Sequence, residues 1–293
     1  MQKILITGSE GFVGKALMPA LNSAGYGVIT LDQSDTGDSL YKCDIRDSGL
    51  AAIFKKESPD IVVHLAAQID VMKSIKDPIS DLGVNGVGTL NVLQASIGAG
   101  VGEFIYINSG GAIYDPSSNL PITESSTIKP LSPYGISKFI GESYVRILCE
   151  ESGIKWTSLA LSNCYGPKSL NQKGVIYEFA KDSAGGKPPV IYGEKLTRDF
   201  IFIDDVVHAI LLTLGKSNNQ RINISSGIET NILQLFIKMR ELLQSDIEPI
   251  IEEPRFGEIQ QNSLSNLLAK EFLGWSPQVG LDEGLIKSLE LKK

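Results

Sequence analysis

Short, mostly apolar runs recur along the first half of the chain, separated by longer segments of mixed polarity. The runs are residues 4–6, 27–31, 61–67, 104–107 and 155–161. They do not alternate between apolar and polar positions, which is typical of strands buried on both faces of a parallel sheet. The segment 78–99, between two of these runs, is helical in its apolar pattern. This order predicts an α/β fold with an open, doubly wound parallel sheet, whose ligands lie beyond the carboxyl ends of the strands.

The second half of the chain is organised differently. Glycine- and proline-rich connections follow residue 163, notably at 185–189, and a strand flanked by charges leads into a helix at 198–214. Further amphipathic helices are predicted near residues 231–243 and 265–273. We therefore predict two domains, residues 1–163 with the parallel sheet and residues 164–293 as a smaller mixed α/β domain, with room for their elements to interleave.

The composition excludes several classes of protein. Hydrophobic residues make up 42% of the chain and charged residues 21%, which is typical of a soluble globular protein. The net charge is −7 and no Lys/Arg-rich stripe is present. Nucleic acid is therefore not an expected partner, because phosphate binding needs clustered cations. No apolar run approaches the roughly 20 residues of a membrane helix, and no signal-peptide pattern is seen, so we expect a cytoplasmic protein without a membrane partner.

The cysteines and histidines argue against metal and redox sites. Cys43, Cys149 and Cys164 are too scattered for a C-x-x-C motif or a disulfide framework. His64 and His208 are the only histidines, which disfavours a histidine-based zinc site and a Ser-His-Asp triad. We therefore expect no metal, and we interpret His64 as a structural residue of its strand.

The first apolar run leads into a turn with regularly spaced glycines. Gly8, Gly11 and Gly14 form the pattern G-x-x-G-x-x-G before a predicted helix. In a dinucleotide-binding turn such glycines allow the tight bend, the approach of backbone to a pyrophosphate, and close packing of helix on strand. The pyrophosphate then lies at the helix N-terminus. A Walker loop is excluded, because five residues separate Gly8 from Gly14 and Ala16, without a hydroxyl, follows Lys15.

A carboxylate follows the second apolar run. Asp32 lies close to the offset of about 20 residues at which an acidic residue accepts hydrogen bonds from an adenosine ribose. A solvated turn residue is the alternative for Asp32 alone. No arginine for the additional phosphate of NADP lies beside it, so NAD is the expected cofactor. Asp44, at a later strand end, is a candidate for contact with adenine.

A tyrosine and a lysine define the candidate catalytic site. A helix is predicted to begin with Ser132 as its N-cap and Pro133 in its first turn. Tyr134 and Lys138 are then four residues apart on one helix face. Lowering the pKa of a tyrosine from about 10 by about three units takes about 4 kcal/mol, which an ammonium and an oxidised nicotinamide can supply together. A surface Tyr/Lys pair is the simpler interpretation of the pair alone; behind a dinucleotide motif it indicates a catalytic base.

Taken together, these motifs resemble those of the extended short-chain dehydrogenase/reductases, in the nucleotide-sugar epimerase/dehydratase family. The matching residues, in family order, are Gly8-x-x-Gly11-x-x-Gly14, Asp32, His64-Leu65-Ala66-Ala67, Asn85, Ser109 with Ile113-Tyr114, Tyr134-x-x-x-Lys138, Asn163-x-Tyr165-Gly166-Pro167, Arg198-Asp199-Phe200 and Pro254-Arg255-x-Gly257. The resemblance covers essentially the whole chain and implies a Rossmann-type fold. It also implies that Tyr134 is the base, that Lys138 holds the nicotinamide ribose and lowers the pKa of Tyr134, and that Ser109 assists.

The resemblance further implies two sets of binding residues. Those for NAD are Gly8, Gly11, Phe12, Val13, Gly14, Asp32, Asp44, Ile45, Leu65, Ala66, Ala67, Asn85, Tyr134 and Lys138. Those for a nucleotide-sugar diphosphate are Asn163, Val190, Tyr192, Arg198, Arg255 and Asn262. The guanidinium groups of Arg198 and Arg255 would neutralise a pyrophosphate that this acidic protein otherwise repels. A surface ion pair is the alternative for each arginine.

Three departures from the family pattern bear on the reaction. Gly110 occupies the position that often carries the catalytic Ser or Thr, so Ser109, one residue earlier, is the expected hydroxyl. Gly111 and Ala112 replace the Asp-Glu pair of 4,6-dehydratases, which disfavours elimination of water. Ala160 stands where many relatives have arginine.

The family supports several reactions on one fold, so the fold alone does not choose among them. A tightly held NAD suits chemistry in which a hydride is removed and returned. The expected function is therefore epimerisation of a UDP-hexose at C4 through a transient 4-keto sugar. The substrates would be UDP-glucose and UDP-galactose, or the N-acetyl forms, which a residue the size of Asn262 leaves room for. An NAD(P)H-dependent 4-ketoreductase of deoxysugar synthesis and a non-catalytic NAD-sensing protein are the alternatives.

Relatives commonly dimerise through two helices, which correspond here to the Asn85 region and to residues 134–149. The resemblance therefore implies a homodimer. Tyr144, Ile147 and Leu148 are candidates for its apolar contacts, and a place in the core is the alternative for them.

Overall fold

The computed structural model describes residues 1–35, 37–167, 174–254 and 259–290. Its central element is a parallel seven-stranded sheet with the order β11-β6-β5-β4-β1-β2-β3. The strands are β1 (Lys3–Thr7), β2 (Gly27–Asp32), β3 (Tyr41–Lys42), β4 (Ile61–His64), β5 (Glu103–Ser109), β6 (Lys155–Leu161) and β11 (Gln220–Ile224). From β1 the chain adds strands in one direction to β3, and then returns to the other side of β1 with β4. Ligands of doubly wound sheets bind at such a reversal of strand order.

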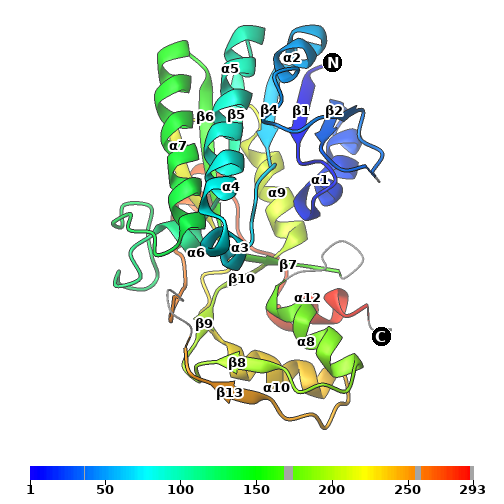
Figure 1. Ribbon diagram of the computed structural model, residues 1–293, viewed down its shortest axis with the longest axis vertical. Coiled ribbons are helices and arrows are strands. Elements are labelled where there is room, and N and C mark those ends of the chain that lie inside the picture. The colour runs from blue at the N-terminus through cyan, green and yellow to red at the C-terminus, as the bar shows by residue number, and fades with distance from the viewer. Residues whose placement is uncertain (36, 168–173, 255–258, 291–293) are drawn as a thin grey trace.

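Helices cover both faces of the sheet (Figure 1). One face packs against α1 (Phe12–Ser23), α9 (Ile203–Thr213) and α11 (Leu267–Leu273), and the other against α2 (Leu50–Glu57), α5 (Thr89–Ala99) and α7 (Pro133–Ser152). Within β1, Ile4 and Ile6 share an apolar cluster with Leu17 of α1, whereas Leu5 shares the opposite cluster with Phe54 of α2. Because each face of the strand meets its own apolar layer, consecutive residues are apolar. The predicted Rossmann-type α/β fold is confirmed.

The predicted helix over residues 78–99 is present, with a π-helical turn in its middle. It consists of α4 (Pro78–Leu82), the π-helix η1 (Gly83–Gly88) and α5. Asp77 caps its start, because its carboxylate accepts a hydrogen bond from the backbone N–H of Ser80. Gly88 of η1 lies close to Ile45, because a Cβ on Gly88 would lie 2.6 Å from Cδ1 of Ile45. The π turn places Asn85 in the interior, where it is 1% exposed.

Smaller elements form the part of the molecule below the sheet in Figure 1. They are β7 (Asn163–Tyr165), β8 (Val190–Tyr192), β9 (Thr197–Arg198), β10 (Phe200–Phe202), β12 (Thr230–Asn231), β13 (Ile250–Glu252), α8 (Val175–Ala184), α10 (Ile232–Leu242) and α12 (Leu281–Ser288). The strands form the pairs β10–β7 and β13–β8, which are parallel, and β12–β9, which is antiparallel. The rings of Tyr165, Phe200, Phe202, Phe179 and Phe236 pack edge to face in its core.

The two parts of the molecule interleave along the chain. Both β11 and α9 come after residue 163, yet β11 pairs with β6 in the central sheet and α9 packs on α1. Two short helices, α3 (Val71–Lys76) and α6 (Gly110–Ile113), come from the first part and lie where it meets the second. The division at residue 163 stays a prediction.

None of the helices in the described part of the chain is long and apolar enough to cross a membrane. Within the same residues, no group of three or more His, Cys, Asp or Glu side chains is placed to hold a metal ion. Cys43, Cys149 and Cys164 are free thiols.

Candidate active site

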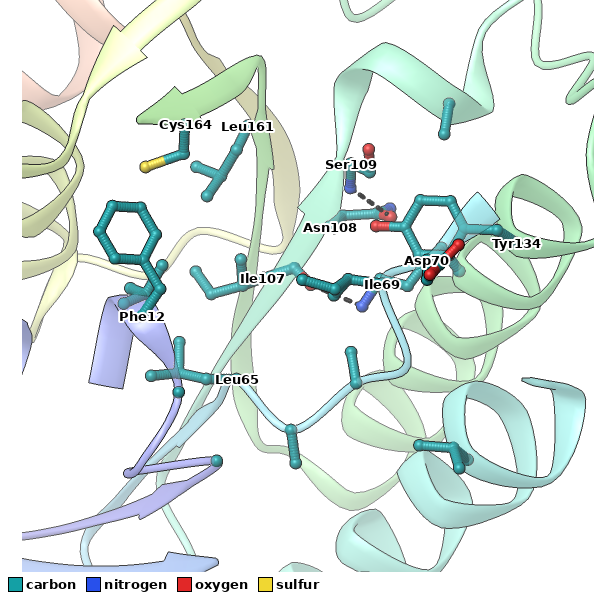
Figure 2. A pocket seen from close by; sticks show the side chains of 18 of the residues that line it. Phe12, Leu65, Ile69, Asp70, Ile107, Asn108, Ser109, Tyr134, Leu161 and Cys164 are labelled. Carbon is teal, nitrogen blue, oxygen red and sulfur yellow. Dashed lines mark hydrogen bonds between the residues drawn. The ribbon is translucent and has the colours of Figure 1, made fainter. Parts of the chain in front are cut away.

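One cavity of about 1170 Å³ opens at the carboxyl ends of the central strands, between the sheet and the smaller part. Most of the residues predicted from the sequence line it. They are Gly8, Gly11, Phe12, Val13, Gly14, Asp32, Asp44, Ile45, Leu65, Ala66, Ala67, Ser109, Tyr134, Lys138, Asn163 and Arg198. Figure 2 shows Phe12 and Leu65 on one side of the cavity and Ser109 and Tyr134 on the other. The fold therefore brings the glycine turn and the tyrosine helix, more than a hundred residues apart in sequence, to one site.

The glycine turn leaves no room for side chains. Gly8 has φ +75°, and a Cβ there would lie 2.6 Å from the backbone nitrogen of Ala66. A Cβ on Gly14 would lie 2.5 Å from the carbonyl oxygen of Gly8. Gly11 is the N-cap of α1 and has no side chain to cap its first turn. The first-turn N–H groups of α1 are therefore available to an anion in the cavity.

Two carboxylates line the cavity near the ends of β2 and β3. Asp32 accepts hydrogen bonds from the backbone N–H groups of Glu10, at 3.0 Å, and Ser34, at 2.9 Å, which fix the orientation of its carboxylate. Asp44 is bound by the Arg46 side chain at 2.9 Å. The hydrogen bonds from Arg46 hold the pKa of Asp44 below its ordinary value. Asp44 is therefore negatively charged at neutral pH.

The helix α7 begins as predicted and carries both catalytic candidates inward. The Ser132 hydroxyl accepts a hydrogen bond from the N–H of Gly135 at 3.1 Å, and Pro133 occupies the first turn. Tyr134 is 8% exposed and Lys138 3% exposed. In Figure 2 the Tyr134 hydroxyl points toward Asn108 and Ser109 at the end of β5.

Burial dominates the ionisation of both candidates. It raises the pKa of Tyr134 to about 12, although a hydrogen bond with the Ser109 side chain acts in the opposite direction. Burial also lowers the pKa of Lys138 to about 7, against the negative charges of Glu142 and Asp81. The protein groups alone therefore do not lower the pKa of Tyr134. A further positive charge in the cavity is needed for Tyr134 to act as a base near neutral pH.

Lys138 is held at the end of β5. Its ammonium group donates a hydrogen bond to the carbonyl oxygen of Ile107 at 2.7 Å. Its Nζ also lies 4.2 Å from the ring centroid of Tyr106, a cation–π contact. The lysine thus stays in the cavity wall without an acidic partner in direct contact among the described residues, and its remaining N–H groups can bind a ligand.

Little space surrounds Gly110, the first residue of α6. A Cβ on Gly110 would lie 2.4 Å from Cδ1 of Leu264 and 3.2 Å from the carbonyl oxygen of Ala160. No side chain fits at Gly110 without displacing these groups. Ser109 lines the cavity, whereas Gly110 is buried behind it.

The comparison with known proteins assigns the chain to a family. The model of the NAD dependent epimerase/dehydratase family matches residues 4–225. The chain belongs to this family. It is 34% identical to a UDP-glucose 4-epimerase of Mycolicibacterium smegmatis, across 98% of this chain and 97% of that protein. It is 30% identical to a dTDP-4-dehydro-6-deoxyglucose reductase of Escherichia coli, across 99% of this chain and 98% of that protein.

A solved structure of a UDP-glucose 4-epimerase has the same fold as this chain. The crystal structure of a UDP-glucose 4-epimerase of Thermotoga maritima with UDP-glucose superposes with a TM-score of 0.94 and 37% identity, covering 99% of this chain and 98% of that one. Family membership confirms the predictions of NAD as the cofactor and of an enzyme of the epimerase type.

The residues of the site fit the NAD that the family uses. Gly8 and Gly14 are packed so closely that a side chain on either would collide with backbone, and this keeps the turn tight. The start of α1 has no side-chain cap, so its N–H groups can bind a pyrophosphate held by this turn. Asp32 is fixed at the edge of the same cavity, where a carboxylate accepts hydrogen bonds from a ribose. Tyr134 and Lys138 lie at the other end of the cavity, against β5.

One residue predicted to contact NAD does not face the cavity. Asn85 uses its whole side chain within the protein: Oδ1 accepts from the N–H of Gln68 at 2.9 Å, and Nδ2 donates to the carbonyl oxygen of Gln68 and to Ser137 Oγ. Asn85 is 1% exposed and is not among the residues that line the cavity. Asn85 joins the loop after β4 to α7, and its contact with NAD stays a prediction.

Four residues predicted to bind the substrate lie elsewhere or outside the described residues. Val190 and Tyr192 belong to β8, which pairs with β13, and they do not line the cavity. Asn262 is 3% exposed and lies behind Thr197, whose hydroxyl accepts a hydrogen bond from its N–H. Arg255 lies outside the residues that the structure describes. Their roles stay predictions.

The sequence interpretation missed several lining residues. Asn108 and Ile107 line the cavity at the end of β5, and Glu178 reaches it from α8. The segment of residues 69–72 also lines it, at the start of α3. The only local signal for this segment is Asp70, which caps α3 by accepting a hydrogen bond from the N–H of Lys73.

Proposed function

We propose that this protein interconverts the C4 epimers of a UDP-hexose through a transient 4-keto sugar. UDP-glucose and UDP-galactose, or their N-acetyl forms, are the proposed substrates. The observation that carries the proposal is the convergence of Tyr134, Ser109 and Lys138 with the dinucleotide-binding turn in one cavity. The proposal is also supported by the 34% sequence identity with a UDP-glucose 4-epimerase along almost the full length of both proteins.

In this mechanism Tyr134 accepts the proton of the sugar 4-hydroxyl. Ser109, whose hydroxyl lies beside that of Tyr134, donates a hydrogen bond to the same sugar oxygen and holds it against the base. NAD, which the glycine turn, Asp32 and Lys138 would hold, would supply the oxidant that accepts the hydride of C4 and gives it back to the other face of the sugar. The positive charge of the oxidised nicotinamide is the one that the buried tyrosine requires, because its pKa is about 12 without it.

Arg198 and Asn163 support a nucleotide diphosphate on the opposite wall of the cavity. Nη1 of Arg198 donates hydrogen bonds to the carbonyl oxygens of Thr197, at 2.7 Å, and Ile259, at 2.6 Å. These bonds hold the guanidinium at the cavity, and a held guanidinium is well suited to phosphate oxygens. Asn163, at the start of β7, is exposed there and lines the same wall.

The lining of the cavity also bears on the rival reactions. Gly111 and Ala112 line it beside Ser109, so neither of these two positions supplies an acid or base for elimination of water. The identity with a dTDP-4-dehydro-6-deoxyglucose reductase supports ketoreduction as a second candidate. That reaction consumes reduced cofactor stoichiometrically, whereas epimerisation returns the hydride, so the two are separable by cofactor balance.

A homodimer is part of the proposal. On α7, Tyr144 and Ile147 are 41% and 50% exposed, and Ile79 of the neighbouring α4 is 84% exposed. Leu148 instead packs on the apolar cluster under α7. An exposed apolar face over two adjacent helices suits an interface between copies. Light scattering should find a dimer, and Ile147→Asp should give a monomer; a monomeric wild-type protein would contradict this.

The function is tested by incubating the purified protein with NAD and each UDP-hexose, and following the anomeric signals by NMR together with NADH absorbance. We expect interconversion of 4-epimers without net NADH formation. Tyr134→Phe should reduce the rate by about 10²- to 10⁴-fold, since general base catalysis is worth that much. Tyr26→Phe, which makes the same change at a tyrosine that does not line the cavity, is the matched control and should retain the wild-type rate. Failure to convert any UDP-hexose, with oxidation of NADH by a 4-keto sugar, would replace epimerisation by ketoreduction.

A further inference from the structure

A buried ion pair lies directly behind the catalytic residues. Glu142, one helical turn after Lys138 on α7, is 5% exposed. Its carboxylate accepts hydrogen bonds from Nε of Arg221 at 2.9 and 3.0 Å, and also from Nη2. Arg221 comes from β11 and lies against the ring of Tyr114, with 5.4 Å from its Cζ to the ring centroid. Neither charge of this pair lines the cavity.

One oxygen of Glu142 serves two further donors. Its Oε2 accepts hydrogen bonds from Nδ2 of Asn108 and from Oγ of Ser158, both at 2.6 Å. The two donor residues lie in different surroundings. Ser158 is buried within β6, whereas Asn108 lines the cavity and precedes Ser109. Asn108 thus connects the ion pair to the active site.

The carboxylate determines which way the Asn108 amide points. A carboxylate only accepts hydrogen bonds, so the NH₂ group of Asn108 must face Glu142. The amide oxygen then faces the backbone N–H of Ser109 and accepts a hydrogen bond from it at 2.8 Å. A rotation of the amide by half a turn would set oxygen against carboxylate and NH₂ against N–H, and both hydrogen bonds would be lost.

The Ser109 hydroxyl is carried by a backbone that is held by this hydrogen bond and by the pairing of Ser109 with Leu161 of β6. Ser109 precedes α6, and its side chain makes no capping hydrogen bond to that helix. Its hydroxyl is therefore aimed by the backbone at residue 109 and by Tyr134. We propose that Glu142, paired with Arg221, is a positioning residue that aims the catalytic Ser109 through the amide of Asn108. The inference rests on the proposed function, because Ser109 is the group that contacts the substrate there.

Glu142 also acts on Lys138 through its charge, since it raises the pKa of Lys138 against burial. The two effects are separable by mutation. Asn108→Ala removes the amide that aims Ser109 and leaves the charges of Glu142 and Arg221 in place. Glu142→Gln removes the charge and weakens the hold on the amide. Ser158→Ala is the matched control, because it deletes an equally short hydrogen bond to the same oxygen of Glu142 but has no connection to Ser109.

Three readouts are compared among these variants and the wild-type protein: kcat and KM with UDP-hexose, the NAD dissociation constant, and hydrogen–deuterium exchange of the backbone amide of Ser109. We expect Asn108→Ala and Glu142→Gln to lower kcat by about 10- to 100-fold, because a misplacement of about 1 Å costs that much. KM and NAD affinity should change by less than about threefold, and exchange at Ser109 should be about tenfold faster. Ser158→Ala should lower the melting temperature and leave kcat and exchange at wild-type values.

Two results would overturn the proposal. One is wild-type exchange at Ser109 in Asn108→Ala; the other is a loss of kcat in all three variants in proportion to their melting temperatures, which would make the role of Glu142 purely structural. If Glu142→Gln does not fold, Asn108→Ala decides, since it keeps the ion pair. If the wild-type protein converts no UDP-hexose, the proposed function fails, and exchange at Ser109 still decides the positioning role.

Discussion

Acidification is predicted to destabilise the fold through one buried histidine. His64 is 1% exposed, and the Thr7 hydroxyl lies 2.6 Å from its Nδ1 and the Thr89 hydroxyl 3.0 Å from its Nε2. Thr89 donates its own proton to the carbonyl oxygen of Asn85, so it accepts from Nε2 and the neutral ring is fully satisfied. Burial, followed by the charge of Lys138, lowers the pKa of His64 from 6.5 to about 3.

The sign and size of the effect follow from this shift. Above pH 6.5 the ring is neutral in both states and contributes nothing to pH dependence. Between pH 6.5 and about 3 the unfolded chain binds a proton that the folded chain does not, so stability falls as the pH is lowered. The slope is about 1.4 kcal/mol per pH unit. At pH 4.5 the loss is therefore about 3 kcal/mol, and over the whole interval it approaches about 5 kcal/mol.

Urea unfolding from pH 4.5 to 7, followed by tryptophan fluorescence, measures this contribution. The other titrating groups are common to the wild-type protein and His64→Asn, so the difference between their slopes isolates His64. We expect the unfolding free energy of His64→Asn to depend on pH less steeply by about 1.4 kcal/mol per unit. His208→Asn replaces an exposed histidine and should follow the wild-type protein. Equal slopes for His64→Asn and wild type would refute the reasoning.

Three further predictions concern the glycine turn, the buried ion pair and the cofactor. Gly14→Ala places a Cβ 2.5 Å from the backbone carbonyl oxygen of Gly8, and displacing that backbone costs about 1–3 kcal/mol. NAD titrations should therefore show an affinity at least about tenfold lower. Gly98→Ala, at a position with open space, is the control and should bind NAD as the wild-type protein does. Arg221→Met leaves Glu142 buried without its cation, and urea unfolding should show a loss of about 3–5 kcal/mol. Adding Glu142→Gln should restore most of it, and no restoration would contradict the pairing. Asp32→Asn should weaken NAD binding and lower the ratio of the protein's affinity for NAD to that for NADP by about tenfold in competition titrations. An unchanged ratio would contradict a contact between Asp32 and the ribose.

The fold was predictable from local patterns. The apolar run at residues 4–6 reads as a buried strand because each of its side chains meets an apolar layer on its own face of the sheet. The start of α7 was predictable from Ser132 and Pro133, because an N-cap and a first-turn proline act within a few residues. The π turn in η1 was not, since it changes hydrogen bonding without changing the apolar period.

The supporting residues of the site were not predictable in the same way. Arg221 and Glu142 are 79 positions apart, and their pairing depends on β11 joining β6 in the sheet. A second example is Ala160, at the position where many relatives have arginine. Ala160 is paired in register with Asn223 of β11. Arg221 lies two residues from Asn223 on the same strand, so its guanidinium lies on the face of the sheet that the side chain of Ala160 shares. The hydrogen bonds of Asn85 to Gln68 and Ser137 were not predictable either, because a motif gives a position and not the direction of its side chain.

The central claim is that the hydride removed from C4 returns to the same carbon. Its most direct test uses a UDP-hexose deuterated at C4, incubated with the protein and NAD in ordinary water, with the product analysed by NMR. We predict that the 4-epimer formed retains its deuterium at C4 while no NADH accumulates. A product that carries hydrogen at C4, or conversion that consumes reduced cofactor in step with product, would contradict the account.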